Sequence, residues 1–276
     1  MRKFNLTLAS STSEKENIHA QCFREIALVL KLGLEELGYE VFFGPGLRKD
    51  CTNIILGYHF LGGKKLPPGY NYIIYQLEQL SENGLLPLAI LNTLKSQNTF
   101  VWDFTERNVE FLAEHGIEAI YKPIGFHPGL NRVQHCKDKD VDVLFYGSRN
   151  PRRIKILSEL YEKFELKVLS GAYGQDRDHW IARSKIVLAL YFYETKYFDN
   201  VRISYLLNNK AFTIVEDTPH KKYEDLLVYA DYDRIVETCG HYLEHEKLRR
   251  EVAEKGFEGF SHYPETEFLK KALAQM

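Results

Sequence analysis

Basic side chains gather at one strand–turn–helix segment in the second half of the sequence. Residues 141–157 read V-D-V-L-F-Y-G-S-R-N-P-R-R-I-K-I-L, where Gly147 and Ser148 follow an apolar run. Asn150 is placed to cap a helix, and Pro151 suits the first position of that helix. Three arginines crowd this helix start: Arg149, Arg152 and Arg153. Cations at a helix start are unfavourable unless an anion offsets them, and the free N–H groups there bind anions. The segment predicts a phosphate-binding turn; the alternative is a solvated basic turn.

A second polar cluster follows the apolar run 186–193. Glu194 lies just past that run, and Asp199 is placed to cap a helix that carries Asn200, Arg202 and Ser204 in its first turns. Such a helix start is suited to a second part of a diphosphate, and a carboxylate such as Glu194 accepts hydrogen bonds from ribose hydroxyls. The alternative is a capped helix in which Arg202 pairs with Asp199 or Glu194.

A third segment, S-G-A-Y-G-Q-D-R over residues 170–177, follows another strand-like run. Its glycines permit close backbone approach, and Tyr173 is able to pack on a nucleobase, although a plain loop is an equal alternative. The sequence contains neither the dinucleotide-binding glycine fingerprint nor a P-loop. We therefore expect no NAD or ATP site.

Candidate proton acceptors in the first half lie at or just beyond the ends of strand-like runs, except His19, which lies near the start of the first helix. Glu78 and Asp103 are the first candidates for a base that deprotonates an acceptor hydroxyl, and His19, His59 and Glu106 are further ones. Each of them is alternatively a structural or solvated group. A reaction that retains configuration needs no such base, because the leaving diphosphate can itself assist.

The elements that position these groups alternate between strand and helix. In the first half, apolar runs at 4–9, 39–43, 53–56, 72–75, 100–104 and 117–121 alternate with helical patterns at 23–37, 85–94 and 106–114. Ser13 and Asn17 lie near the start of the first helical pattern, and Gly38 ends it. In the second half, strands at 141–146, 167–169, 186–193 and 211–215 accompany helices at 202–207, 232–244, 248–259 and 265–274 and the one that starts at Pro151. This alternation predicts mainly parallel sheets.

The sequence predicts an α/β protein of two Rossmann-like domains that face each other across a cleft. We expect an acceptor-side domain at 1–125, a linker at 126–140 with the charge run K-D-K-D, and a nucleotide-binding domain at 141–262. A final helix covers 263–276. Ligands in such sheets bind beyond the carboxyl ends of the strands, where the three basic and polar clusters lie.

Composition limits the classes of partner and cofactor. The net charge of −2 over 276 residues gives no general nucleic-acid footprint. The four cysteines form no C-x-x-C pair, so we expect no metal site, and reduced thiols without a signal peptide indicate a cytoplasmic protein. No apolar run approaches the ~18 residues of a membrane span.

Most of the chain resembles the GT-B glycosyltransferases, especially the short group-1-like bacterial and viral ones. The stretch from V-D-V-L-F-Y-G-S-R-N to I-V-E-D-T-P is similar to their donor domain. The segments I-I-Y-Q-L-E-Q-L, V-W-D-F-T-E-R-N and K-P-I-G-F-H-P are similar to their acceptor domain and hinge. The resemblance implies a nucleoside-diphosphate sugar held without a metal by the second domain, and a last helix that crosses back to the first. It also implies a glycan or glycoconjugate acceptor and no further cofactor.

One position departs from the family pattern. Retaining members carry E-x7-E after the strand that precedes the donor helix, and here the matching residues are Glu194 and Arg202. The replacement leaves the stereochemistry open and places a positive charge where sugar or phosphate would lie. The sequence thus predicts a hexosyltransferase-like enzyme. The alternatives are a sugar-nucleotide epimerase and a non-catalytic nucleotide-sugar-binding protein of the same fold.

Overall fold

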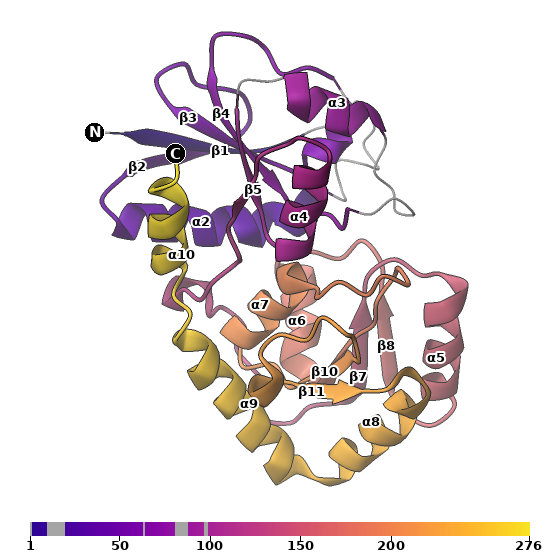
Figure 1. Ribbon diagram of the computed structural model, residues 1–276. Coiled ribbons are helices and arrows are strands. Elements are labelled where there is room, and N and C mark those ends of the chain that lie inside the picture. Colours follow the sequence, from indigo (N-terminus) through magenta and orange to yellow (C-terminus); the bar gives the residue numbers. More distant parts are fainter. Residues whose placement is uncertain (1, 10–19, 63, 81–87, 97–98) are drawn as a thin grey trace. The chain divides into compact units, whose positions relative to one another are not determined.

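The computed structural model describes residues 2–9, 20–62, 64–80, 88–96 and 99–276 (Figure 1). The chain divides into two compact units. Unit 1 comprises Met1–His127 and Pro264–Met276, and unit 2 comprises Pro128–Tyr263. Each unit is built on one parallel sheet with helices, which confirms the predicted α/β class with two Rossmann-like domains.

Unit 1 contains a six-stranded sheet in the order β2-β1-β3-β4-β5-β6. Its strands are β1 (Lys3–Leu8), β2 (Glu40–Phe43), β3 (Thr52–Leu56), β4 (Asn71–Gln76), β5 (Phe100–Asp103) and β6 (Ile120–Tyr121). Its helices are α2 (Arg24–Glu36), α3 (Leu88–Ser96), α4 (Glu106–Glu114) and α10 (Glu265–Leu273). Gly38, with φ of +85°, adopts the left-handed conformation that follows the end of α2.

The C-terminal helix α10 belongs to unit 1 and lies against α2 (Figure 1). The approach is close, since a Cβ on Gly33 of α2 would lie 2.8 Å from Leu269 Cδ1. Where α10 begins, Lys122 and Glu265 form an ion pair with no exposed surface. Glu265 Oε2 also accepts a hydrogen bond of 2.7 Å from the backbone N–H of Gly125. The sequence-predicted return of the last helix to the first domain is confirmed.

Unit 2 contains a five-stranded sheet in the order β11-β10-β9-β7-β8. Its strands are β7 (Val141–Tyr146), β8 (Leu166–Leu169), β9 (Ser184–Ala189), β10 (Thr213–Glu216) and β11 (Val228–Ala230). Its helices are α5 (Pro151–Tyr161), α6 (Gln175–Arg183), α7 (Asn200–Asn208), α8 (Ile235–Glu244) and α9 (Glu246–Ser261). Single 3-10 turns are η1 (Gln21–Phe23) and η2 (Tyr58–Leu61) in unit 1, and η3 (Pro128–Leu130), η4 (Glu224–Leu226) and η5 (Tyr232–Arg234) in unit 2.

The strands of unit 2 are apolar on both faces because helices cover both. Phe145 and Leu188 face the side on which α5 and α8 pack, and they form one core with Leu160 and Cys239 of those helices. Leu144, between two residues of that core in sequence, points to the opposite face and is equally buried. Continuous apolar strands of this kind are typical of parallel sheets.

Several sequence-based boundaries differ from the structure. The predicted strand 186–193 ends at Ala189, the helix expected from residue 232 begins at Ile235 after a 3-10 turn, and α6 and β11 were not predicted. In the stretch 126–140, expected as a linker, the backbone N–H groups of Arg132 and Val133 donate to Asn209 Oδ1 at 2.7 and 2.9 Å. Ser13, Asn17, His19 and the first residues of the predicted helix 85–94 lie outside the described residues. None of the described helices is long and apolar enough to cross a bilayer.

Candidate functional site

The strand order of unit 2 reverses direction between β7 and β9, since β7 pairs with β8 on one side and with β9 on the other. Ligands of doubly wound sheets bind at such a switch point, beyond the carboxyl ends of the two strands. Two side chains join the turns that follow β7 and β9. Asn150 Nδ2 donates to the carbonyl oxygen of Phe192 at 2.9 Å, and Arg153 Nη2 donates to that of Leu190.

Arg153 lies at this switch point because α5 begins there. Asn150 caps α5 as predicted, with Oδ1 accepting from the Arg153 N–H at 2.9 Å. The Arg153 side chain is buried, and Nη1 donates to the Ser148 carbonyl oxygen at 2.7 Å. Burial, and then the nearby charge of Arg202, lower the pKa of Arg153 to about 9. The guanidinium therefore stays charged at neutral pH in a place where its charge is costly.

Arg202 reaches the same point from the first turn of α7. Asp199 caps that helix as predicted and accepts from the Arg202 N–H at 3.2 Å. Arg202 Nε lies 3.4 Å from Asp199 Oδ2, yet Nε and Nη1 have no hydrogen-bond partner among the described residues. The predicted alternative, an Arg202–Asp199 pair, is thus present but leaves buried donors unused. Buried donors without a hydrogen bond are unfavourable, so an acceptor supplied by a ligand or by water would stabilise them.

Gly147 allows the two arginines to converge. Its φ of +139° lies in the region that favours glycine. A Cβ at this position would lie 3.1 Å from Arg202 Nη2 and 3.6 Å from Arg153 Nη1. Two guanidinium groups therefore meet over the backbone of the turn after β7. An anion between them would relieve their mutual repulsion and use the free donors.

Arg152, by contrast, turns away from the switch point. It pairs with Glu216 at the end of β10 through both carboxylate oxygens, with 2.7 Å between Nη1 and Oε2. Glu216 has no exposed surface and also binds Lys196 Nζ at 2.9 Å and the Tyr191 N–H at 3.1 Å. The expectation that all three arginines of the turn crowd one anion site is wrong for Arg152. Its charge is paired with Glu216 in the Glu216–Arg152–Lys196 cluster, in which one carboxylate serves two cations.

The Glu216 cluster predicts a defined pH dependence of stability. Burial would raise the pKa of Glu216, but the hydrogen bonds from Arg152 and Lys196 outweigh burial and hold that pKa below 4.5. A carboxyl whose pKa is lower in the folded protein than in the unfolded chain stabilises the fold at pH values above its unfolded pKa. This contribution disappears as the pH falls through the folded pKa. The stability lost in Glu216→Gln should be constant at neutral pH and shrink below pH 4.5.

Urea unfolding of wild type and Glu216→Gln over a pH series measures this difference. The matched control is Glu237→Gln, because Glu237 pairs with Arg234 at 3.0 Å on the exposed surface of α8. Surface pairs contribute little, so the control should unfold nearly as wild type does. A Glu216→Gln deficit that does not change with pH would contradict this account of the cluster.

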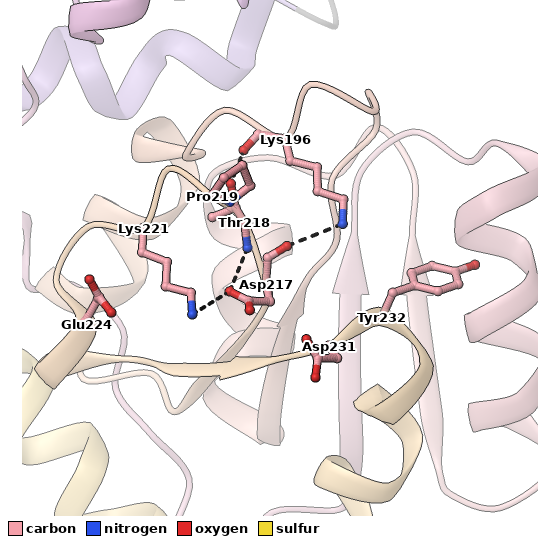
Figure 2. Close-up of a pocket in the computed structure, with 8 residues that line it drawn as sticks. All are labelled: Lys196, Asp217, Thr218, Pro219, Lys221, Glu224, Asp231 and Tyr232. Atoms are coloured by element: carbon pink, nitrogen blue, oxygen red, sulfur yellow. Dashed lines mark hydrogen bonds and ion pairs between the residues drawn. The ribbon is translucent and has the colours of Figure 1, made fainter.

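A pocket of about 570 Å³ lies at the carboxyl ends of β10 and β11 (Figure 2). It shares Lys196 with the Glu216 cluster. It is lined by Lys196, Asp217, Thr218, Pro219, Lys221, Glu224, Asp231 and Tyr232. Figure 2 shows Lys196 and Lys221 turned toward Asp217, with 2.9 Å between Lys221 Nζ and Asp217 Oδ1. The Tyr232 ring stacks on Arg152, 4.1 Å from its guanidinium carbon. The lining is rich in hydrogen-bonding groups of both signs.

The other predicted donor-site residues are dispersed along the same edge of the sheet. Ser148, Arg149 and Glu194 are exposed. Tyr173, on the loop after β8, is half-buried, whereas Ser204 is buried within α7 and its hydroxyl lies 3.5 Å from the Val201 carbonyl oxygen. The structure therefore brings Gly147, Arg153 and Arg202 together and buries Asn200 at the first position of α7. The other five lie at the margins of this cluster or inside the helix.

Two residues that the sequence did not single out also lie at this edge. Arg177, in the first turn of α6, is buried and lies 4.1 Å from the ring centroid of Tyr205. Its Nη2 atom lies 2.8 Å from Asp178 Oδ1. Lys196 adopts a left-handed conformation with φ of +48°, and its carbonyl oxygen accepts from the Thr218 hydroxyl. Neither has a local sequence signal, because Tyr205, which Arg177 contacts, and Glu216 and Thr218, which Lys196 contacts, come from distant segments.

The two predicted bases in unit 1 have different environments. Glu78 follows β4 and is half-exposed, and its Oε1 lies 3.6 Å from Nε2 of His59. Burial lowers the pKa of His59 to about 4, so that imidazole is neutral at pH 7. Asp103 has no exposed surface and accepts from the Thr105 N–H at 2.9 Å and from Asn108 Nδ2 at 3.0 Å. Burial raises its pKa well above the ordinary value. Asp103 therefore holds the turn after β5 through these two hydrogen bonds.

No group of three or more histidine, cysteine, aspartate or glutamate side chains is arranged to hold a metal ion in the described ranges of the chain. The cations of the candidate site are guanidinium and ammonium groups. These are the groups that any phosphate-bearing ligand would meet at the carboxyl edge of this sheet.

No protein-family model matches the sequence, and no curated protein matches it. Solved structures do match the fold. An alpha-glucosyltransferase in complex with UDP and a 13-mer DNA is 11% identical with a TM-score of 0.64, over 100% of this chain and 99% of that one. The T4 phage beta-glucosyltransferase is 10% identical with a TM-score of 0.60, over 100% and 98%. TarM is 13% identical with a TM-score of 0.56, over 94% of this chain but only 58% of TarM.

These likenesses, at 10 to 13% identity, concern the fold. The chain has the fold of the GT-B glycosyltransferases, as the sequence resemblance led us to expect. Because one fold hosts several activities, the activity must be argued from the site.

Proposed function

We propose that this protein is a glycosyltransferase that moves a sugar from a nucleoside-diphosphate donor to a hydroxyl group of a glycan or glycoconjugate. The observation that carries the proposal is the convergence of Arg153 and Arg202 over Gly147 at the switch point of unit 2. The buried Arg153 and the half-buried Arg202, in the first turns of α5 and α7, hold donors without hydrogen bonds and are suited to a diphosphate. The GT-B fold supports the same assignment.

In this proposal Arg153 and Arg202 stabilise the leaving group. The acceptor oxygen forms a bond to the anomeric carbon, and the bond between that carbon and the β-phosphate oxygen breaks. The departing nucleoside diphosphate gains negative charge, which Arg153 and Arg202 stabilise more strongly than they stabilise the intact donor. Because guanidinium groups supply this charge, we propose that transfer does not require a metal, and EDTA should leave the rate unchanged.

We also propose places for the remaining parts of the substrates. The pocket beside the Glu216 cluster offers carboxylates, ammonium groups and the Tyr232 ring, which suit the hydroxyl-rich part of a donor. In unit 1 the half-exposed Glu78 is the better of the two predicted bases. If the reaction inverts configuration, the proton of the acceptor hydroxyl passes to Glu78.

Thermal shifts with UDP, GDP, dTDP and CDP test the donor site. A ligand at 100 times its dissociation constant adds about 2.7 kcal/mol of stability, so one nucleotide should raise the unfolding temperature clearly. The sugar donors of that nucleotide are then incubated with the protein, with and without acceptors, and the products are identified. If none of the four nucleotides shifts the unfolding temperature, the assignment of the donor site is wrong.

The products separate the transferase from its two alternatives. Release of nucleoside diphosphate together with a glycosylated acceptor supports the proposal. If the sugar on the intact donor is altered when no acceptor is present, the protein is an epimerase. If the donor binds but no product forms, the protein is a non-catalytic nucleotide-sugar-binding protein. The acceptor panel includes a DNA duplex, since the alpha-glucosyltransferase of like fold was solved with DNA. The net charge of −2 favours a glycan over DNA.

A further inference from the structure

A second cavity, of about 520 Å³, lies in unit 1 at the amino ends of its strands. Its lining includes the first residues of four neighbouring strands: Lys3 of β1, Thr52 of β3, Asn71 of β4 and Phe100 of β5. Ligands of doubly wound sheets bind at the opposite edge, beyond the carboxyl ends of the strands, where Glu78 follows β4. This amino-edge cavity therefore lies outside the site proposed for sugar transfer.

The charge at the amino-edge cavity is positive, although the whole chain carries −2. Arg2, Lys3 and Lys49 line the cavity together with a single carboxylate, that of Asp50. Lys3 Nζ lies 2.9 Å from Glu40 and 4.0 Å from Asp50, so its charge is paired. Within the described ranges, Arg2 and Lys49 have no carboxylate partner. The cavity thus offers two cations to an anionic ligand.

Polar and aromatic groups of the same lining are open to a ligand. Thr52 is 8% exposed, and its hydroxyl makes no hydrogen bond to any residue whose placement is described. A hydroxyl is both a donor and an acceptor, and Asn71 adds an exposed side-chain amide. Phe100 is 40% exposed. Burial raises the pKa of the Cys51 thiol, so no thiolate in the lining repels an anion.

The walls of the amino-edge cavity are held in place by the buried side chain of Asn53. Its Oδ1 accepts from the Arg48 N–H at 2.9 Å, and its Nδ2 donates to the carbonyl oxygens of Arg48 at 2.9 Å and Asn71 at 3.2 Å. Asn5 Nδ2 donates to Asn53 Oδ1 at 2.9 Å and to the Gly46 carbonyl oxygen at 3.0 Å. The loop between β2 and β3 is thus fastened to the starts of β3 and β4. A site with fixed walls loses little conformational entropy when a ligand binds.

We infer that the amino-edge cavity binds a small organic anion. Arg2 and Lys49 hold its phosphate or carboxylate group, the Thr52 hydroxyl donates to one of the anionic oxygens, and an apolar part of the ligand packs on Phe100. Guanidinium and ammonium groups form their strongest hydrogen bonds with such anions. The volume is that of a small-molecule site.

Titration calorimetry on the full chain tests the inference with phenyl phosphate, benzoate, inorganic phosphate and phenol. Phenyl phosphate or benzoate should bind more tightly than inorganic phosphate, and the tighter of the two identifies the anionic group. Phenol lacks the charge and should bind at least tenfold more weakly than either. Phe100→Ala should weaken the tighter aromatic anion about fivefold and change inorganic phosphate by less than twofold, because only the apolar contact is lost.

Two double variants separate the cavity from net charge. Arg2→Met/Lys49→Met should weaken the tighter aromatic anion by at least tenfold. Lys64→Met/Lys65→Met removes the same charge from exposed residues of unit 1 that do not line the cavity, and it should bind as wild type does. All four replaced residues are exposed, so thermal unfolding should show each variant to be folded.

Three results would overturn the inference. The first is that wild type binds neither phenyl phosphate nor benzoate, and the second is an equal loss in the two double variants. The third is a loss in Arg202→Met with none in Arg2→Met/Lys49→Met, which would place the anion at the switch point of unit 2. None of these results depends on whether a nucleotide binds to unit 2.

Discussion

Arg202→Met is expected to weaken nucleoside-diphosphate binding by about 10- to 100-fold while leaving the free protein as stable as wild type or more stable. Charge-assisted hydrogen bonds contribute about 1.5–3 kcal/mol, and 1.4 kcal/mol corresponds to a factor of ten. Without ligand, Arg202 holds unused donors beside the like charge of Arg153, so a methionine relieves both costs. Calorimetric titration and thermal unfolding of the same samples measure the two effects.

A matched arginine shows whether charge alone explains the result. Arg234 is 65% exposed and pairs with Glu237 at 3.0 Å. Arg234→Met therefore also removes one positive charge from unit 2, but from its exposed surface. That variant should bind nucleotide as wild type does. Equal losses in the two variants would assign the effect to net charge. A sharp fall in the stability of Arg202→Met would instead make Arg202 a structural residue.

Glu265→Gln is expected to lower the free energy of unfolding by about 3–5 kcal/mol, because it leaves the Lys122 charge buried without its partner. Burial already lowers the pKa of Lys122, and the attraction of Glu265 opposes that effect. The substitution keeps the volume of the side chain and an oxygen that accepts from the Gly125 N–H. The double variant Lys122→Met/Glu265→Gln should recover most of the loss, since no charge then remains buried. Urea unfolding measures all three proteins.

Glu267 provides the control on the same helix. It pairs with Lys270 at 2.7 Å, and both side chains are more than half exposed. Glu267→Gln should therefore change stability by less than about 0.5 kcal/mol. A double variant no more stable than Glu265→Gln alone would show that the two side chains contribute independently and that their pairing is unimportant.

Local patterns were sufficient to predict the elements that carry strong sequence signals. Apolar runs located β7 and β9, and the predicted caps Asn150 and Asp199 both accept the hydrogen bonds expected of them. Helix α6 is not predicted from the sequence, because its residues, Q-D-R-D-H-W-I-A-R, are mostly polar. One of its buried residues is an arginine, Arg177. Its packing depends on Asp178 and Tyr205, a pair that no local window contains.

The site itself was predictable only in part. Arg152 and Arg153 are adjacent and indistinguishable in sequence, yet one pairs with Glu216 and the other lies at the switch point. Which way each side chain turns is decided by Glu216, more than sixty residues later in the chain. Glu78 follows β4 and Asp103 is the last residue of β5, but Asp103 is fully buried whereas Glu78 is half-exposed. The position of a residue at the end of a strand predicts that it lies at the carboxyl edge of the sheet. Whether its side chain is exposed there depends on residues that are distant in sequence.

Unit 1 is discontinuous, because α10 is separated from the other elements of its unit by the whole of unit 2. During synthesis, a chain grows at about 5–20 residues per second and domains generally fold as units. Lys122 would then leave the ribosome well before Glu265 exists to neutralise it, whereas residues 128–263 are complete as one uninterrupted stretch. The order in which the segments leave the ribosome therefore favours complete folding of unit 2 before unit 1. Unit 1 can complete its fold only when α10 has been synthesised.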